Sequence, residues 1–143
     1  MDAVEAIYSA SETRITGDSG AGGLAAAGHQ KVSTVIRAGD PQRTFPDNRI
    51  EVQINPVEND FELGARGIDA VVRFKIVTKR DLGFVKQNAI EERLIARFKD
   101  TTALSASGWT FSAPVLLRPA FQTGASDTEL EAVVEFMYHL QAA

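Results

Sequence analysis

Ile68-Asp-Ala-Val-Val-Arg-Phe-Lys-Ile-Val-Thr78 is the stretch of sequence that decides the fold. Its side chains alternate between an apolar side, formed by Ala70, Val72, Phe74 and Ile76, and a mixed side, formed by Val71, Arg73, Lys75 and Val77. This period of two predicts a half-buried β-strand. Beyond it the period changes, because Ile90, Leu94 and Phe98 recur at the spacing of an amphipathic helix. We therefore expect a long strand followed by a helix that packs back over it.

Two further strands are predicted by the same alternation. Residues 48–55 place Ile50, Val52 and Ile54 on one face before Pro56 ends the run, and residues 109–117 alternate around Pro114. Because proline cannot donate to a ladder, Pro114 predicts an edge strand or a bulge there. Residues 57–67 and 118–127 are expected to be two long protruding loops.

The last segment, residues 129–141, fits two patterns. A strand would place six residues on one face, from Leu130 to Leu140, whereas a helix would give a shorter stripe with Asp127 as its N-cap. The longer match and the β-branched and aromatic content favour a strand. With a short amphipathic helix at residues 3–11, the order becomes α-β-β-α-β-β. We predict an α+β domain spanning residues 1–143, with an antiparallel sheet of about four strands and helices packed on one face.

Residues 17–28 are rich in glycine, which predicts a flexible surface loop. Gly20, Gly22 and Ala25 imitate a dinucleotide-binding fingerprint. That fingerprint requires a buried strand before it and a helix after it, and the flanking sequence favours neither.

Composition limits the possible functions. The chain has 15 Lys and Arg against 19 Asp and Glu, a balance that argues against a dedicated nucleic-acid binder. It contains no Cys, which excludes disulfides and thiolate chemistry. The longest apolar runs are far shorter than the ~20 residues of a membrane span, and the N-terminal residues lack the pattern of a signal peptide, so we expect no membrane association.

The sequence offers little support for catalysis. His29 and His139 do not form a metal-binding spacing, and the serines at 105, 107 and 126 have no pattern of a nucleophile with its base. Adjacent Glu91 and Glu92 would lie about 100° apart on a helix, which suits a solvated face. We therefore predict no catalytic residues, no cofactor and no metal site.

Opposite charges are predicted on two strands. Arg73 and Lys75 project from one strand, and Glu129, Glu131 and Glu135 project from the last one. These residues could pair across strands of one wet face, or they could join two subunits. Four of them, together with the tip of the loop at residues 57–67, form the hypothesised subunit interface: Arg73, Lys75, Glu131, Glu135, Asn59, Asp60 and Phe61.

The order of elements resembles that of phage tail terminator proteins, also called tail-completion or head-to-tail joining proteins. The stretches that carry the resemblance are the short N-terminal helix, the glycine-rich connector, the strand entry Phe45-Pro-Asp-Asn-Arg-Ile-Glu-Val-Gln-Ile54, the strand at residues 68–78, and Ala89-Ile-Glu-Glu-Arg-Leu-Ile-Ala-Arg-Phe98. The resemblance covers most of the chain but includes no diagnostic short motif.

The resemblance implies a homo-oligomeric ring, usually a hexamer, located in the virion and assembled in the host cytoplasm. Such a ring caps the tail tube and joins it to the neck and head, and its partners are the tail-tube protein, a neck or head-completion protein, and DNA that passes without sequence-specific binding. The family supplies no catalytic residues. A neck stopper, a tail-tube subunit and a small-ligand-binding domain are the alternatives.

Overall fold

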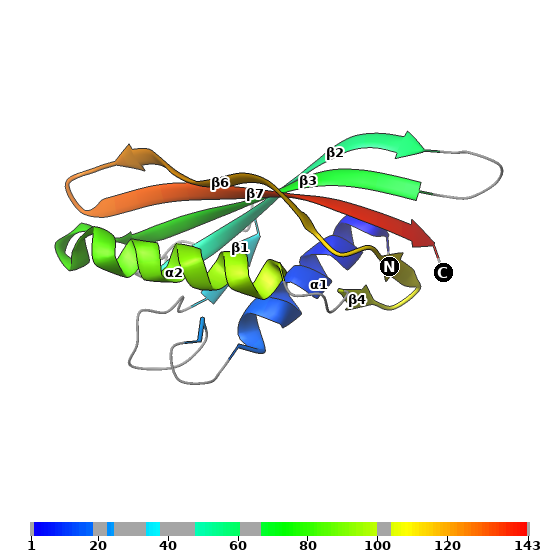
Figure 1. The fold of residues 1–143 in the computed structure, drawn as a ribbon, viewed down its shortest axis with the longest axis horizontal. Helices are drawn as coiled ribbons and strands as arrows, with labels where there is room; N and C mark the ends of the chain where they lie inside the picture. The colour runs from blue at the N-terminus through cyan, green and yellow to red at the C-terminus, as the bar shows by residue number, and fades with distance from the viewer. Residues whose placement is uncertain are drawn as a thin grey trace.

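The computed structural model describes residues 2–18, 23–24, 34–37, 48–60, 67–99 and 104–142. Two α-helices and a sheet make up this part of the chain, so the expected α+β class is confirmed, with strand predominating (Figure 1). The elements are α1 (Ala3–Thr16), β1 (Thr34–Arg37), β2 (Arg49–Asp60), β3 (Gly67–Lys79), a 3-10 turn (Arg80–Leu82), α2 (Gly83–Phe98), β4 (Ser105–Ala106), β5 (Trp109–Phe111), β6 (Val115–Ala125) and β7 (Glu129–Ala142).

The sheet is larger than the four strands that the sequence predicts. In the described part of the chain it has seven strands in the order β1-β2-β3-β7-β5-β4, with β6 also paired to β7. β1 runs parallel to β2, and the other pairs are antiparallel. β1 and β4 are not predicted from the sequence, because strands of four and two residues are too short for a periodic signal.

The prediction of a loop at residues 118–127 is wrong. These residues belong mainly to β6, which pairs with β7 from Val115 to Ala125 through three register shifts. The irregular ladder tolerates Pro119 and removes the clean alternation that would have identified a strand. Pro114 lies in the break between β5 and β6. The connection to β7 is short, and within it the Ser126 side chain accepts a hydrogen bond from the Glu129 amide at 3.0 Å.

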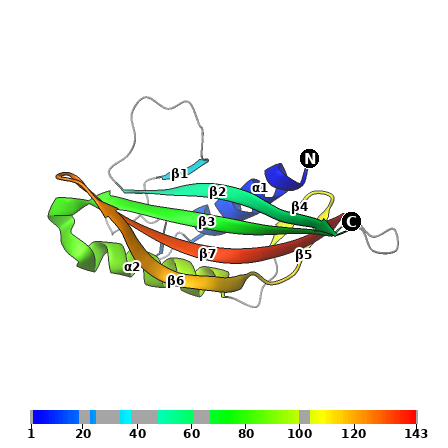
Figure 2. The ribbon, with the colours of Figure 1, turned by 90° about the horizontal axis from the view of Figure 1, so that it is seen from above.

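The last segment is a strand, as predicted. β7 pairs with β3 along its length, from Gly67 opposite Gln141 to Lys79 opposite Glu129. β2 pairs with the other edge of β3. β3 is therefore central, with β2 and β7 as its neighbours, and Figure 2 shows these strands side by side from above.

Both helices cover one face of the sheet, as predicted (Figure 1). Asp2 caps the N-terminus of α1, because its carboxylate accepts a hydrogen bond from the Glu5 amide at 2.8 Å. The helix extends to Thr16 rather than ending at residue 11. The buried face of α2 consists of Gln87, Ile90, Leu94 and Phe98. Ile90, Leu94 and Phe98 form the apolar stripe that the sequence predicts, and Gln87 is a polar residue on the same buried face.

The core lies between this helix layer and the sheet. Phe74 is fully buried, and its ring centroid lies 4.9 Å from that of Phe98 and 6.0 Å from that of Phe136. From the sequence patterns we expect twelve core residues on the predicted strands and on the helix that follows residue 80, and eleven of them are buried. The twelfth, Ile54, is partly exposed and packs against the core. The confirmed set is Ile50, Val52, Val72, Phe74, Ile76, Ile90, Leu94, Phe98, Phe111, Val134 and Phe136.

One end of the glycine-rich segment is anchored, which corrects the prediction of a flexible loop at its start. The Asp18 carboxylate accepts hydrogen bonds from Arg93 on α2, at 2.7 Å from Nε and 2.5 Å from Nη2, and from the Leu24 amide at 2.9 Å. Leu24 is buried in the core. Residues 19–22 and 25–33 lie outside the described residues, and they include Gly20, Gly22 and Ala25 of the imitation fingerprint.

Candidate functional site: the open face of the sheet

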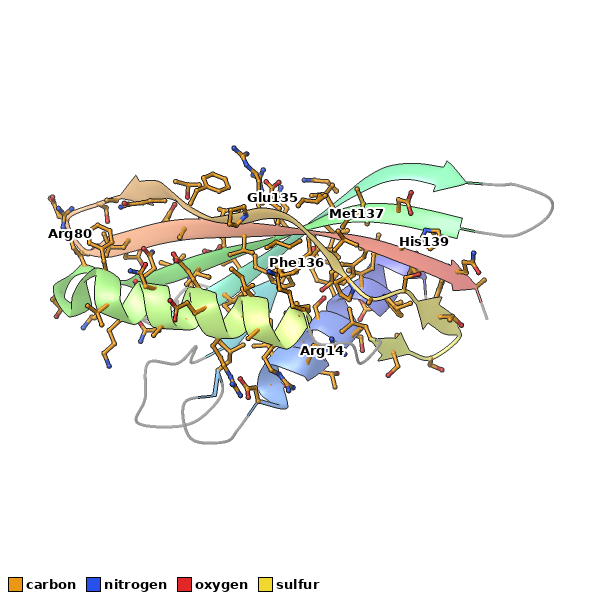
Figure 3. The ribbon with its side chains drawn as sticks, in the orientation of Figure 1. Arg14, Arg80, Glu135, Phe136, Met137 and His139 are labelled. Carbon is orange, nitrogen blue, oxygen red and sulfur yellow. The ribbon has the colours of Figure 1, made fainter. Side chains whose placement is uncertain are left out.

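The face of the sheet that the helices leave uncovered is the candidate site, and we call it the open face. It is formed by Arg49, Glu51 and Gln53 of β2, by Val71, Arg73, Lys75 and Val77 of β3, and by Glu131, Val133, Glu135 and Met137 of β7. In Figure 3, Glu135 and Met137 point away from the helices, whereas Phe136 points toward them. The alternation in β3 and β7 therefore separates a buried apolar face from a charged one.

Arg73 and Glu135 form the central contact of the open face. They stand opposite each other on β3 and β7, and the Arg73 Nη2 atom lies 2.7 Å from Glu135 Oε1. The Glu135 side chain is only 12% exposed, so this pair is shielded from water more than an ordinary surface pair. Arg118 of β6 stands opposite Glu135 on its other side, and its guanidinium lies 4.3 Å from the ring centroid of Phe121.

Lys75 bridges two strands on the same face. Its Nζ atom lies 3.4 Å from Glu131 Oε1 on β7 and 3.7 Å from Glu51 Oε2 on β2. Glu51 also accepts a hydrogen bond from Arg49 at 3.3 Å. The Glu51 carboxylate therefore contacts both Lys75 and Arg49.

Arg49 extends this network to the start of β7. Its Nη1 atom donates to Glu129 Oε2 at 2.8 Å, and its side chain is only 9% exposed. The network thus crosses β2, β3 and β7 and holds these strands in register through side chains as well as the backbone ladder.

The other end of the open face carries a different pair. Asp69 and His139 are opposed on β3 and β7, and His139 Nδ1 lies 2.5 Å from Asp69 Oδ1. Between this pair and Glu135 lies an apolar row in which Val71, Met137 and Val115 occupy matched positions on β3, β7 and β6. Val115 is 59% exposed.

The four charged residues of the hypothesised interface thus lie together on one face. They pair within one chain, which is the alternative that the sequence left open, and their role between subunits stays a prediction. Asn59 and Asp60 are the last residues of β2 and pair with Ile68 and Gly67, so the predicted loop is shorter than residues 57–67. Phe61 lies outside the described residues.

Sequence reasoning missed Arg49, Glu51 and the Asp69–His139 pair. Arg49, Glu51 and Gln53 are spaced two residues apart in an alternating strand, so the sequence already indicates that they lie on the same face of the sheet. Their partners depend on which strands are neighbours, and alternation within each strand carries no such information.

The remaining candidate groups are dispersed. Glu92 is exposed, while burial, followed by repulsion from Glu92, raises the pKa of the partly buried Glu91 carboxyl above its usual value. Within the described ranges, no group of three His, Cys, Asp or Glu side chains could hold a metal ion. His29 is outside those ranges. None of the helices described is both long and apolar enough to cross a membrane.

The comparisons with known proteins show a similarity of fold and nothing further. No family model and no curated protein matches the chain. Among the solved structures that match, one covers 96% of this chain and 94% of its own, with a TM-score of 0.63 and 14% sequence identity. The name of that protein states no function. The chain therefore shares its overall fold with a protein of almost the same extent.

Proposed function

We propose that this chain is a tail terminator of a tailed phage, a ring-forming structural protein that caps the tail tube and joins it to the neck while leaving a channel for DNA. The proposal rests first on the resemblance in element order. The observation that carries it further is the open face, a long charged surface on one side of the sheet whose central cations are bridged to carboxylates.

Such a face suits the lining of a DNA channel. Arg49, Arg73 and Lys75 each lie within ion-pair distance of a carboxylate, so little uncompensated positive charge is offered to phosphates. Proteins that hold DNA tightly do so by replacing its counterions with basic side chains. A chain of net charge −4 whose open-face cations are paired would let DNA pass with little retention.

The ring itself requires two unlike surfaces on each subunit, because head-to-tail contacts close into a ring. We propose that Arg73, Lys75, Glu131 and Glu135 contribute to such a contact, with the tip after Asn59 and Asp60 as a second element. Their pairing within the chain is compatible with this role only if some pairs exchange partners on assembly.

Electron microscopy and sedimentation velocity of the purified protein test the proposal. Closed rings of one size, at concentrations that support assembly, are the expected result. Open-ended tubes would favour the tail-tube alternative, and a monomer or dimer at every concentration would contradict the ring. Addition of the protein to uncapped tails should place one ring at the end of each tube and make the tails competent to join heads, which a neck stopper alone would not do.

A binding site for a drug-sized ligand is less well supported. Among the described residues, a pocket of about 100 Å³ lies between α1 and β4. Sites for such ligands usually enclose about 300–1,000 Å³.

A further inference from the structure

The β6 side of the open face carries an apolar strip, which we define as Val71 of β3, Met137 of β7, and Val115 and Phe121 of β6. Val71, Met137 and Val115 stand in one register row across the three strands, and Phe121 lies two rows further along β7. Val115 is 59% exposed, and Leu117, which lies in the register shift after Leu116, is 44% exposed. Exposed apolar groups that gather in one place mark contact surfaces.

The cation beside this strip differs from the other cations of the open face. Arg73 and Lys75 lie within ion-pair distance of carboxylates of their own chain. Arg118 contacts the ring of Phe121, and within the described part of the chain no carboxylate forms an ion pair with it. The carboxylate opposite, Glu135, is engaged by Arg73. The strip therefore combines exposed apolar groups with an uncompensated positive charge, and its complement is an acidic segment that carries apolar side chains.

The chain itself contains such a segment where β2 leads into β3. Residues 57–63, which we call the tip segment, read Val-Glu-Asn-Asp-Phe-Glu-Leu. They carry three carboxylates and no basic residue, together with Phe61 and Leu63. The described part of the chain includes this segment as far as Asp60, the last residue of β2. Its charge and its apolar side chains match those that the strip lacks.

The tip segment does not cover the strip of its own chain. Asp60 lies at the register level of Gln141, four residues along β7 from Met137, and β3 and β7 separate β2 from β6 (Figure 2). Strands advance ~3.3 Å per residue and lie ~4.8 Å apart, which places Asp60 roughly 19 Å from Val115. Leu63 is three residues beyond Asp60, a reach of at most ~11 Å. A tip segment that meets the strip must therefore come from another copy.

We propose that the tip segment of one copy binds the apolar strip of the next copy, with Phe61 against Val115 and Met137 and the acidic side chains beside Arg118. The contact deepens the proposed ring function and rests on it, because strip and tip are the two unlike surfaces that a head-to-tail contact requires. The strip adjoins the row of Arg73 and Glu135, so the two form one continuous contact region.

Complementary charge reversals test the contact by sedimentation velocity. The strip variant carries Arg118→Glu, and the tip variant carries Asp60→Lys and Glu62→Lys. Each variant alone opposes like charges at every junction, so we expect self-association to weaken on the order of tenfold or more. Lys99→Glu is the matched control, since it reverses an exposed charge at the end of α2, on the helix side, and it should assemble normally.

An equimolar mixture of the strip and tip variants should assemble again. When the two variants alternate, every junction pairs either the two wild-type surfaces or the two reversed ones. Assembly of either variant alone at wild-type concentrations, or a mixture that stays dissociated, would overturn the proposal. Strip-variant rings that no longer bind tail tubes would reassign the strip to the tail-tube protein and contradict a second copy as its occupant.

A synthetic peptide of residues 56–64 tests the contact without a ring. It is titrated into the ¹⁵N-labelled tip variant, whose strip is intact and whose own tip segment cannot compete. We expect saturable shifts centred on the amides of Val115, Phe121 and Met137. A peptide with Phe61→Ser should bind on the order of tenfold more weakly, because the apolar anchor is lost. Shifts that rise linearly, or that lie elsewhere, would overturn the proposal.

The two measurements separate the failure of this contact from the failure of the ring. Rings formed by the wild type and by both variants, with no peptide binding, would reject the contact and leave the ring standing. Saturable peptide binding by a chain that forms only open assemblies would reject the ring and keep the contact.

Discussion

Arg73 on β3 donates two hydrogen bonds to the same carboxylate oxygen of Glu135 on β7, at 3.2 Å from Nε and 2.7 Å from Nη2. The two residues are direct neighbours across the antiparallel ladder. Their side chains face away from the helices, so the contact joins two strands outside the core. The pair therefore contributes to sheet register within one chain, whatever further role it has in assembly.

Arg73→Glu should lower the free energy of unfolding by about 1 kcal/mol, because it replaces a cross-strand ion pair with opposed like charges. Adding Glu135→Lys should recover most of this loss, as measured by urea denaturation. Sedimentation of the same proteins separates the two roles. Loss of rings with little change in unfolding would support the interface assignment, whereas rings of normal size at low salt in Arg73→Glu would reject it.

Phe74→Ala should destabilise the protein by about 3–5 kcal/mol, because it opens a cavity among Phe98 and Phe136. Phe84→Ala is a suitable control, since Phe84 is 53% exposed at the start of α2 and its removal should change stability by less than ~0.5 kcal/mol. Thermal and chemical denaturation measure both. Similar losses in the two variants would mean that the buried and exposed positions are misassigned.

Asp18→Asn should destabilise the protein at neutral pH by about 1.5–3 kcal/mol, since it weakens the charge-assisted bonds from Arg93. The hydrogen bonds from Arg93 hold the pKa of the Asp18 carboxyl below its usual value, against an opposing effect of burial.

A carboxyl whose pKa is lowered by folding stabilises the native state fully above its unfolded pKa of ~3.9, and it loses that contribution as the pH falls through the folded pKa. The stability difference between the wild type and Asp18→Asn should therefore be constant near neutrality and shrink in acid. A difference that grows on acidification would contradict the ion pair.

Tyr138 and Ser11 share a buried hydrogen bond of 2.9 Å between their hydroxyl groups. Burial raises the pKa of the Tyr138 phenol above its usual value, more than Ser11 and Arg14 lower it, so the phenol remains neutral. Tyr138→Phe should cost ~1–3 kcal/mol, because it leaves the Ser11 hydroxyl buried without this partner.

Combining Tyr138→Phe with Ser11→Ala should cost less than the sum of the single changes, because neither polar group is then left unpaired. A double-mutant cycle in urea gives the coupling free energy. Strictly additive losses would show that the hydroxyl groups do not depend on each other.

The sequence by itself determined the elements whose pattern is regular. Alternation in β3 and β7 identified both strands and their buried faces, and the stripe of Ile90, Leu94 and Phe98 identified the buried face of α2. These assignments held because burial on one side of an element imposes a local period. The mixed charges of the opposite side were visible for the same reason.

Only the tertiary structure decided what depends on contacts between distant segments. β6 is a strand because β7 offers it an edge, although bulges erase its period. Arg73 meets Glu135 because β3 and β7 are neighbours, and Asp18 is held because α2 brings Arg93 to it. A sequence pattern shows which side of a strand or helix is apolar. Which elements become neighbours depends on the free energy of the whole packed chain, and no single stretch of sequence contains that information.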